Sequence, residues 1–459
     1  MDTDRFFDPQ FRDDTLLKRR PWYALAVALF LLSALAHVPV AFLAGLFVLV
    51  IGLVPEIWYR CALHHLTIQQ RVSQRYLFFG EDVTLSISAE NKKLLPLPWL
   101  EVEDEIPSFV TVLNGHTSAS YKANRSVLVY ALSLWSFQRV TRHYHLRCTA
   151  RGVYSFGPVT IQSSDPLGWL MREEQVAANE TLFVYPLVAP LSSFGLPARH
   201  PFGEYTTPRR LLEDPLRFAG IRDYRAGDDP RRIHWKATAR TGALRSKIYE
   251  PSSQYRLLVV LDINTYTASW MGVDPEIQEL TISTAASIAT WGFDQGYAVG
   301  LLTNSLMVPL SDTNAMGSDS ASMHPTTTTH TSVPRVRVPF ASDRGQRKRL
   351  LLALARLLPY LGEPIDQLLE EERDLLPRET TVVLVSATAA LTSATIERLV
   401  DVQHHGVNVH LVLIGDEEEK GKQETYELPI SYVGGREVWH ELVKTHDETG
   451  QSPTALHLD

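Results

Sequence analysis

The sequence predicts a multidomain chain in which an N-terminal transmembrane α-hairpin precedes a β-sandwich-like domain and a doubly wound α/β domain. Three observations support this order. A charge-free apolar run fills residues 22–54, two-residue alternation follows from about residue 66 to 186, and short apolar runs alternate with amphipathic stretches after residue 254. The three patterns are typical of helices in lipid, half-buried strands, and a sheet covered by helices.

The apolar run is too long for one helix. From Trp22 to Trp58 a single helix would measure about 55 Å at about 1.5 Å per residue, against a hydrocarbon core of about 30 Å. Pro39 cannot donate a backbone hydrogen bond, and it disfavours a helical conformation at Val38. We therefore expect two antiparallel helices over residues 21–59, joined by a bend at His37, after an N-terminal segment of residues 1–20.

Charges and aromatic rings at both ends of the run predict its orientation. Trp22 opens the run and Trp58 closes it, as amphipathic rings do at membrane interfaces. Basic residues flank both ends, which predicts a two-pass cell-membrane protein with cytoplasmic soluble domains. The alternative is a secretory signal, because residues 34–36 resemble a cleavage site. The apolar run continues past them, however, and the leader is acidic. The basic flanking residues are Lys18, Arg19, Arg20, Arg60, Arg71 and Arg75.

Composition narrows the functional classes. The chain has 459 residues, enough for two or three domains beside a membrane anchor. Its net charge of −8 argues against a general nucleic-acid binder, so we expect no nucleic-acid partner. Cys61 and Cys148 are the only cysteines, which excludes a disulfide framework and a Cys-rich zinc site. Two unpaired cysteines also fit a reducing cytoplasm.

Residues 60–188 are predicted to form the β domain. Apolar and polar residues alternate in segments such as 83–88 and 127–132, and turn signals such as Asn114-Gly115 separate these segments. His143 and His145 share a strand face without an evident third ligand, so we assign no metal there.

Residues 254–445 are predicted to form the α/β domain, because strand-like and helix-like segments alternate. Within it, residues 311–342 are polar and have no apolar period, which favours a disordered insertion. Residues 446–459 are expected to form a flexible tail. The predicted strands cover 256–262, 297–302, 381–385 and 407–414, and the predicted helices cover 276–291, 346–361 and 393–404.

The connecting segment, residues 189–253, contains the densest motif. Asp228 or Asp229 can cap a helix that begins at Pro230, and Gly242 can end it in a left-handed conformation. Arg232, Lys236 and Arg240 would then share one helix face, where like charges repel each other. Their acidic counterpart is either intramolecular or a partner's acidic surface or phosphate. Ile233 and Ala237 would pack on the sheet, and Trp235 with Ile233 makes this a packed element, which favours the structural role. The intramolecular candidates are Asp223, Asp228, Asp229 and Glu250.

This motif resembles the signature of the bacterial and archaeal domain of unknown function 58 family. The resemblance implies a membrane hairpin, a β domain and a von Willebrand factor A-like α/β domain. It also implies a protein partner, a MoxR-type AAA+ ATPase. The signature or partner-binding residues are Gly227, Asp228, Asp229, Pro230, Arg231, Arg232, His234, Trp235, Lys236, Arg240 and Gly242.

A von Willebrand factor A-like fold implies a test for a divalent metal site, since such domains can hold an ion in an Asp-x-Ser-x-Ser loop. The corresponding residues here are Asp262, Asn264 and Tyr266, so a ring replaces a small hydroxyl. Ser386 stands where metal-binding versions have an Asp. Hard cations need several well-placed oxygens, and this loop looks degraded. We expect no metal and no cofactor, with Asp262 and Asn264 as the candidate ligands if an ion does bind.

Motifs for catalysis do not occur in the sequence. It has no Gly-rich phosphate loop, HExxH helix or nucleophile elbow, so we expect no enzyme. The leading hypothesis is a membrane-anchored scaffold or adaptor that works with a MoxR-type AAA+ ATPase in assembly or maturation of envelope or protein complexes. The alternatives are a metal-dependent ligand-binding receptor and a hydrolase with an unrecognised site.

Overall fold

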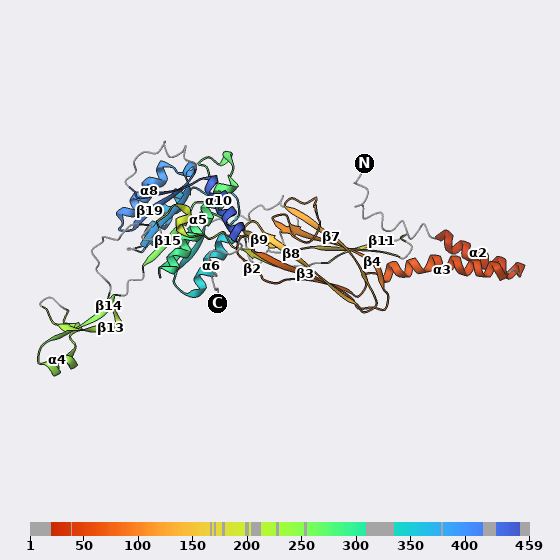
Figure 1. Cartoon of the computed structure of the whole chain (residues 1–459), viewed down its shortest axis with the longest axis horizontal. Helices are drawn as coiled ribbons and strands as arrows, with labels where there is room; N and C mark the ends of the chain where they lie inside the picture. Colours follow the sequence, from red (N-terminus) through yellow and green to blue (C-terminus); the bar gives the residue numbers. More distant parts are fainter. Residues whose placement is uncertain are drawn as a thin grey trace. The chain divides into compact units, whose positions relative to one another are not determined.

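The computed structural model describes residues 20–37, 39–165, 168, 171–176, 180–197, 202, 213–225, 229–251, 255–308, 335–377, 380–415 and 428–449. These residues form two compact units (Figure 1). The first contains the described residues up to Val184, and the second contains those from Tyr185 onward.

An apolar helical hairpin opens the first unit. It consists of α2 (Arg20–Ala36) and α3 (Pro39–Cys61), which run antiparallel (Figure 1). The helices approach closely at Gly45, where an added Cβ would meet Ala26 O at 3.3 Å, as small residues permit in membrane helix pairs. Among the described helices, α3 is long and apolar enough to cross a membrane, and residues 21–36 form a shorter apolar helix. The helices break at His37, whose φ is 52°, where Pro39 predicts a bend.

The remainder of the first unit is a β-sandwich-like structure. A four-stranded sheet has the order β1-β3-β8-β5, a five-stranded sheet has the order β11-β10-β4-β7-β6, and a small sheet joins β2, β12 and β9. The strands are β1 (Leu66–Val72), β2 (Tyr76–Leu77), β3 (Asp82–Asn91), β4 (Leu97–Pro107), β5 (Val110–Val112), β6 (Thr117–Ala119), β7 (Arg125–Leu134), β8 (Arg139–Cys148), β9 (Gly152–Ser155), β10 (Val159–Ser164), β11 (Met171–Val176) and β12 (Thr181–Val184).

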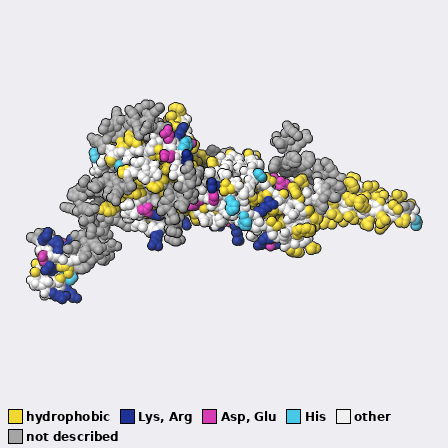
Figure 2. Space-filling view, viewed as in Figure 1, with side chains coloured by type: hydrophobic (Ala, Val, Ile, Leu, Met, Phe, Trp, Pro, Cys, Tyr) yellow, Lys and Arg dark blue, Asp and Glu magenta, His cyan; other side chains and the backbone are white. Residues whose placement is uncertain are grey.

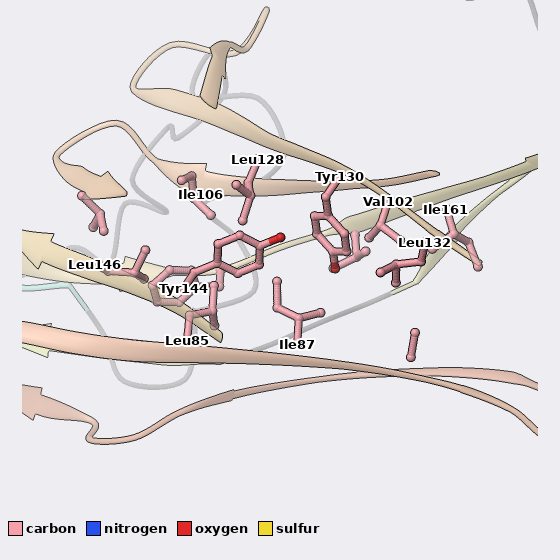
Figure 3. Close-up of a cluster of buried hydrophobic side chains, with 14 of the residues drawn as sticks. Leu85, Ile87, Val102, Ile106, Leu128, Tyr130, Leu132, Tyr144, Leu146 and Ile161 are labelled. Carbon is pink, nitrogen blue, oxygen red and sulfur yellow. The ribbon is translucent and has the colours of Figure 1, made fainter. Parts of the chain in front are cut away.

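The predicted alternation places one face of each sheet in a shared core. Leu85 and Ile87 of β3 point inward, as do Val102 of β4 and Leu128 of β7 (Figure 3). Apolar side chains every second residue bury one face and leave the other to solvent. The β-rich fold expected from residues 60–188 is therefore present.

A separate hairpin lies within the second unit. Strand β13 (Glu213–Asp223) pairs antiparallel with β14 (Arg245–Pro251). The chain between them contains a 3₁₀ turn, η2 (Pro230–Arg232), and helix α4 (Trp235–Thr241). We call residues 213–251 the basic hairpin, and it contains the described part of the predicted motif.

The rest of the second unit is built on a six-stranded sheet with the order β17-β16-β15-β18-β19-β20, in which only β17 is antiparallel to its neighbour. Helices α5, α6 and α10 contact one another or the sheet on one side, while α7 and α8 share a core with the other side. The elements are β15 (Arg256–Leu261), α5 (Pro275–Asp294), β16 (Ala298–Thr303), β17 (Val336–Ala341), α6 (Arg344–Ala355), α7 (Ile365–Glu372), β18 (Thr380–Ala387), α8 (Ser393–His404), β19 (Asn408–Ile414), β20 (Ile430–Gly434) and α10 (Arg436–Thr449).

This strand order is that of a doubly wound sheet, as predicted from the alternating segments. Neighbouring strands β15 and β18 mark the point where the order reverses, and ligands of open α/β sheets bind outside the carboxyl ends of strands at such a point. The side chains that follow β15 and β18 are therefore the candidates for a ligand-binding site.

Three predicted boundaries are wrong. The helix predicted over 346–361 ends at Ala355 as α6. The insertion predicted at 311–342 includes Val336–Ala341, which forms β17 because this segment pairs with β16 and buries Val336. The flexible tail predicted from residue 446 begins inside α10, which continues to Thr449 and buries Leu442. Residues 309–334 and 450–459 lie outside the described residues.

Candidate functional site

Asp262 lies at the carboxyl end of β15 and is 2% exposed. Its Oδ1 accepts hydrogen bonds from the Asn264 backbone N–H at 3.1 Å and from Asn304 Nδ2 at 2.9 Å. Its Oδ2 accepts one from Ser386 Oγ, at the end of β18, at 3.0 Å. The structure thus brings three strand ends together around one buried carboxylate.

A loop before α7 closes this cluster. Asn264 Oδ1 accepts a hydrogen bond from the Gly362 N–H at 2.8 Å, and Asn304 Nδ2 also donates to Glu363 O at 2.6 Å. A Cβ added to Gly362 would stand 2.4 Å from Asn304 O, so this close approach requires glycine. We call Asp262, Asn264, Asn304, Ser386 and Gly362 the Asp262 cluster.

The donors in the cluster do not fit a divalent cation. Burial raises the pKa of Asp262 to about 6, and the hydrogen bonds from Asn264, Asn304 and Ser386 oppose that shift. Both carboxylate oxygens receive N–H or O–H groups, whereas a hard cation needs oxygen lone pairs directed at it. No group of three His, Cys, Asp or Glu with metal-binding geometry occurs in the described ranges.

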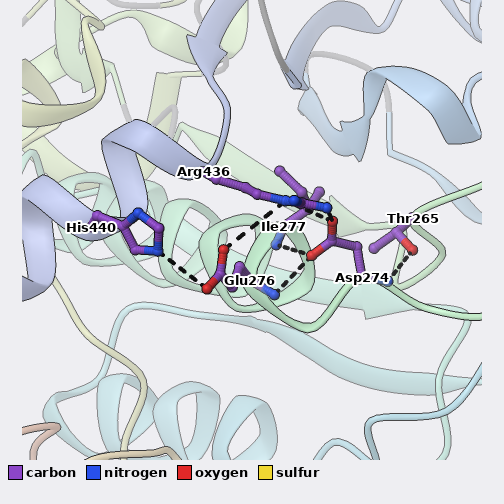
Figure 4. A network of polar contacts seen from close by, with 6 residues as sticks. All are labelled: Thr265, Asp274, Glu276, Ile277, Arg436 and His440. Atoms are coloured by element: carbon purple, nitrogen blue, oxygen red, sulfur yellow. Dashed lines mark hydrogen bonds and ion pairs between the residues drawn. The ribbon is translucent and has the colours of Figure 1, made fainter.

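A pocket of about 60 Å³ lies beside the cluster at the same edge of the sheet. Asp274 lines it and caps α5, accepting hydrogen bonds from Glu276 N at 3.1 Å and Ile277 N at 3.3 Å. Arg436 of α10 donates to Asp274 Oδ2 from Nε at 3.0 Å and from Nη2 at 2.5 Å (Figure 4). Glu276 also lies 3.1 Å from His440 Nε2.

Sequence reasoning did not identify this ion-pair network. The Asp274-Pro275 pair is a helix-start signal that could have located the cap. No comparable sequence signal marks Arg436, because it reaches Asp274 across 162 positions of chain. The pocket is lined by Thr265, Tyr266, Asp274, Ile277, Ala387, Ala389, Ile414, Gly415 and Arg436.

The motif helix is divided in two. Asp229 Oδ1 accepts a hydrogen bond from Arg231 N at 2.9 Å and caps η2, as predicted. Ile233 then forms an isolated antiparallel β-bridge with Ser246. The prediction of one continuous helix from Pro230 to Gly242 is therefore wrong. His234 Nδ1 accepts a hydrogen bond from Ala237 N at 3.0 Å and caps α4.

The C-terminus of α4 lies where the sequence predicts it. Gly242 ends α4 with a φ of 69°, in the predicted left-handed conformation. Gly227 and Asp228 lie outside the described residues.

The predicted three-cation stripe is also divided. Arg232 belongs to η2, and only Lys236 and Arg240 lie one turn apart on α4, both exposed. Trp235 was expected to pack, but its side chain is 68% exposed, whereas Ile233 is buried. The surface of α4 therefore presents an indole and two cations.

The acidic counterparts expected within the chain are only partly described. Asp223, one of the four, pairs with Arg245 at 2.8 Å within the basic hairpin. Asp229 is used as the cap of η2. Asp228 lies outside the described residues, and the side chain of Glu250 does too.

Comparisons with solved structures give only weak likeness. A CARDB domain from Pyrococcus furiosus is 13% identical, with a TM-score of 0.18, and the match covers 26% of this chain and 91% of that domain. A non-cellulosomal cohesin from Archaeoglobus fulgidus is also 13% identical, with a TM-score of 0.17 and the same two coverages. Scores this low carry no functional argument.

Sequence comparisons are more informative. The family model described as "Protein of unknown function DUF58" matches residues 220–318, which include α4 and Asp262. The uncharacterized protein YeaD of Bacillus subtilis (strain 168) is 26% identical over 194 residues, 42% of this chain. The matched region spans 46% of YeaD, less than half its length. The family match and this relative, together with the motif now located on α4, make residues 220–318 similar to the DUF58 family.

Proposed function

We propose that this chain is a membrane-anchored scaffold or adaptor that presents α4 to a protein partner. The observation that carries the proposal is the surface of α4, which exposes the indole of Trp235 and the two cations Lys236 and Arg240. Tryptophan and arginine are enriched among the residues that dominate binding at protein interfaces. The indole of Trp235 is 68% exposed on this seven-residue helix, so it is available for contact with a partner.

Charge indicates the kind of partner. Lys236 and Arg240 are exposed cations one helical turn apart, so they repel each other and favour an acidic surface opposite them. The partner we propose is a MoxR-type AAA+ ATPase, which the family resemblance implies. The cargo would then be an envelope or protein complex under assembly or maturation.

The proposed placement is two-pass, with the soluble units in the cytoplasm. It is supported by the antiparallel pairing of α2 with α3 and by basic residues on both flanks. The α/β domain is proposed to be von Willebrand factor A-like, with support from its strand order and from the position of Asp262 after β15.

Neither alternative gains support from the site. A metal-dependent receptor needs Asp262 to offer oxygen lone pairs, and three hydrogen bonds to its carboxylate compete with a cation for them. One common class of hydrolase uses a histidine base that is oriented by a third group. His410 Nε2 lies 2.9 Å from Ser431 Oγ, but its buried Nδ1 has no hydrogen-bond partner among the described residues.

Co-purification of the full chain from detergent-solubilised membranes tests the proposal. Lys236→Glu/Arg240→Glu and, separately, Trp235→Ala should each lower recovery of the ATPase several-fold. Arg344→Glu/Lys444→Glu is the matched control, because it makes the same change in net charge on the α/β domain. Unchanged recovery with both α4 variants would remove α4 from the interface.

A further inference from the structure

Three large apolar side chains gather at one end of the β-sandwich-like structure. Leu94 lies in the β3–β4 loop, and Trp135 and Phe137 lie in the β7–β8 loop, with exposures of 77%, 71% and 69%. We call these three residues the apolar tip. Single exposed apolar residues are ordinary, but an exposed cluster of this kind marks an interaction surface.

The two loops are bound to each other. Phe137 N donates to Lys93 O at 3.3 Å, and Ser136 Oγ donates to Leu94 O. Buried Asn91 donates from Nδ2 to Leu95 O at 2.9 Å and to Trp135 O at 3.0 Å. A buried amide that joins both loops holds the apolar side chains in place.

The tip adjoins the end of α3. Lys93 Nζ donates to His64 O at 2.8 Å and to Ala62 O, just after the last helical residue, and Lys92 N donates to His65 O at 3.0 Å. A cation at a helix C-terminus is favourable, because carbonyl groups there lack helical partners. In Figure 2, hydrophobic side chains continue from the hairpin onto the adjoining end of the β structure.

Strand β11 contacts the same helix end. Arg172 Nη1 donates to Arg60 O at 2.9 Å and to Tyr59 O at 3.3 Å, and its guanidinium lies 6.0 Å from the centre of the Tyr59 ring. Contacts from two sides of the sandwich therefore fix its position relative to the last turn of α3.

We propose that Leu94, Trp135 and Phe137 insert into the headgroup layer of the bilayer that α3 crosses, an inference that rests on the proposed membrane anchoring. The final turn of α3 carries Trp58 and Tyr59, the residue types that settle at a membrane interface. The adjacent tip adds a second tryptophan and a phenylalanine at the same end of the unit. A lipid surface is the occupant because the tip is continuous with the apolar hairpin.

Charge further defines the contact. Lys92 and Arg139 beside the tip pair with Glu90 at 3.6 Å and 2.7 Å, and Arg60 pairs with Glu56 at 2.7 Å. Arg60 has its own acidic partner, and Lys92 and Arg139 share Glu90, so we assign insertion to the apolar side chains.

Depth-dependent quenching in vesicles tests the insertion. The full chain, with exposed Cys61 changed to Ser and buried Cys148 kept, receives one cysteine by Leu94→Cys, Phe47→Cys or Tyr121→Cys and an NBD label at that position. Phe47 lies within α3. Tyr121 is 83% exposed and belongs to the opposite end of the sandwich, beyond the ten-residue strand β7, which spans about 33 Å.

The fluorescence emission of the NBD label at position 94 should be blue-shifted. Lipids spin-labelled near the headgroup should quench it several-fold more than they quench the label at position 121. The quenching should already occur in zwitterionic vesicles, because the apolar side chains drive the insertion. Trp135→Ser/Phe137→Ser in the Leu94→Cys chain should reduce that quenching several-fold.

Two outcomes would overturn the inference, and they can be distinguished. A water-exposed label at 94, with strong quenching of the label at 47 by deep spin labels, refutes tip insertion and leaves the membrane anchor intact. Weak quenching at 47 as well as at 94 refutes both the anchor and the tip.

Discussion

Ser386 Oγ donates a hydrogen bond to Asp262 Oδ2 at 3.0 Å, and this contact joins the carboxyl ends of β15 and β18 at the point where the sheet order reverses. A crevice at this position commonly receives a ligand in doubly wound sheets. Here the polar groups at the strand ends bind one another. The Asp262 cluster is therefore expected to stabilise the α/β domain. Substitutions in the cluster should lower the stability of that domain.

Ser386→Ala should destabilise the α/β domain. It leaves a buried carboxylate oxygen without the donor that Ser386 supplies, and loss of a hydrogen bond to a charged group costs about 1–3 kcal/mol. Hydrogen exchange of the full chain should show faster opening of β15 and β18. Ser393→Ala, at an exposed position that starts α8, is the matched control. Equal exchange in the two variants would show that the Asp262 cluster contributes little to stability.

Asp104 should make the β structure less stable as pH rises. Burial raises the pKa of its carboxyl from 3.8 to about 7; Gln70 opposes the shift by donating a hydrogen bond to Oδ2, Glu105 adds to it and Arg125 opposes it. The folded state therefore holds a proton that the unfolded state has lost between those values. The contribution of Asp104 to stability is most favourable below pH 3.8 and falls until about pH 7.

Asp104→Asn tests this dependence, because the amide oxygen can still accept from Gln70 without a charge. The variant should exceed the parent in stability by a few kcal/mol above pH 7 and converge with it toward pH 4. Hydrogen exchange of β3 and β4 at a series of pH values provides the measurement. A difference in stability between variant and parent that does not vary with pH would contradict the raised pKa of Asp104.

Loss of the Asp274 cap should cost more than loss of its ion pair. Asp274→Ala removes the acceptor for two backbone N–H groups of α5, an effect of about 1 kcal/mol. Arg436→Met removes a pair whose arginine is 55% exposed, so solvent screens much of its contribution although Asp274 is 7% exposed. Amide hydrogen-exchange rates in α5 and α10 distinguish loss of the cap from loss of the ion pair. Asp274→Asn, which keeps a capping side chain, should resemble Arg436→Met.

Two glycines should respond differently to alanine. At Gly242 an added Cβ has nothing within 4 Å, so Gly242→Ala should cost only the left-handed conformation, about 1 kcal/mol. At Gly362 the Cβ would meet Asn304 O at 2.4 Å, so the loop must move and lose its hydrogen bond to Asn264. Thermal unfolding of the purified full chain should show the larger loss for Gly362→Ala. The reverse order would contradict the packing at Gly362.

The proposed topology predicts that external protease leaves the chain intact. If both ends of the hairpin face the cytoplasm, protease added to intact spheroplasts should cut nothing, and lysis should expose both soluble units. Immunoblots against the two ends of the chain provide the measurement. Digestion of the β domain from outside would refute the two-pass arrangement.

Local patterns predicted the elements whose formation depends on near neighbours. Alternation in residues 83–88 and 127–132 predicted strands, Pro39 predicted the bend, and Gly242 predicted the end of α4. In each case the physical cause lies within a few residues, as side-chain period or backbone restriction.

The missed features depend on distant partners. Ile233 interrupts the motif helix because it bridges to Ser246, which becomes its neighbour only after β13 and β14 pair. Strand β17 is an exception, because Val336, Val338 and Phe340 alternate as in a strand, but it directly follows a long polar stretch and its place in the sheet comes from pairing with β16. The Asp262 cluster depends on Gly362, a hundred positions later, so its residues could be proposed as ligands but not recognised as partners of one another.

The length of α2 has a consequence for the surrounding lipid. Its 17 residues span about 25 Å, whereas a typical hydrocarbon core measures about 30 Å. Tyr23 near its start donates to Gly52 O at 3.3 Å and to Glu56, so the polar end of the hairpin is set at that level on both helices. In the two-pass arrangement this is a hydrophobic mismatch, which a bilayer accommodates by thinning around the hairpin. Because α3 has 23 residues and spans about 34 Å, this thinning is expected only on the α2 side of the hairpin.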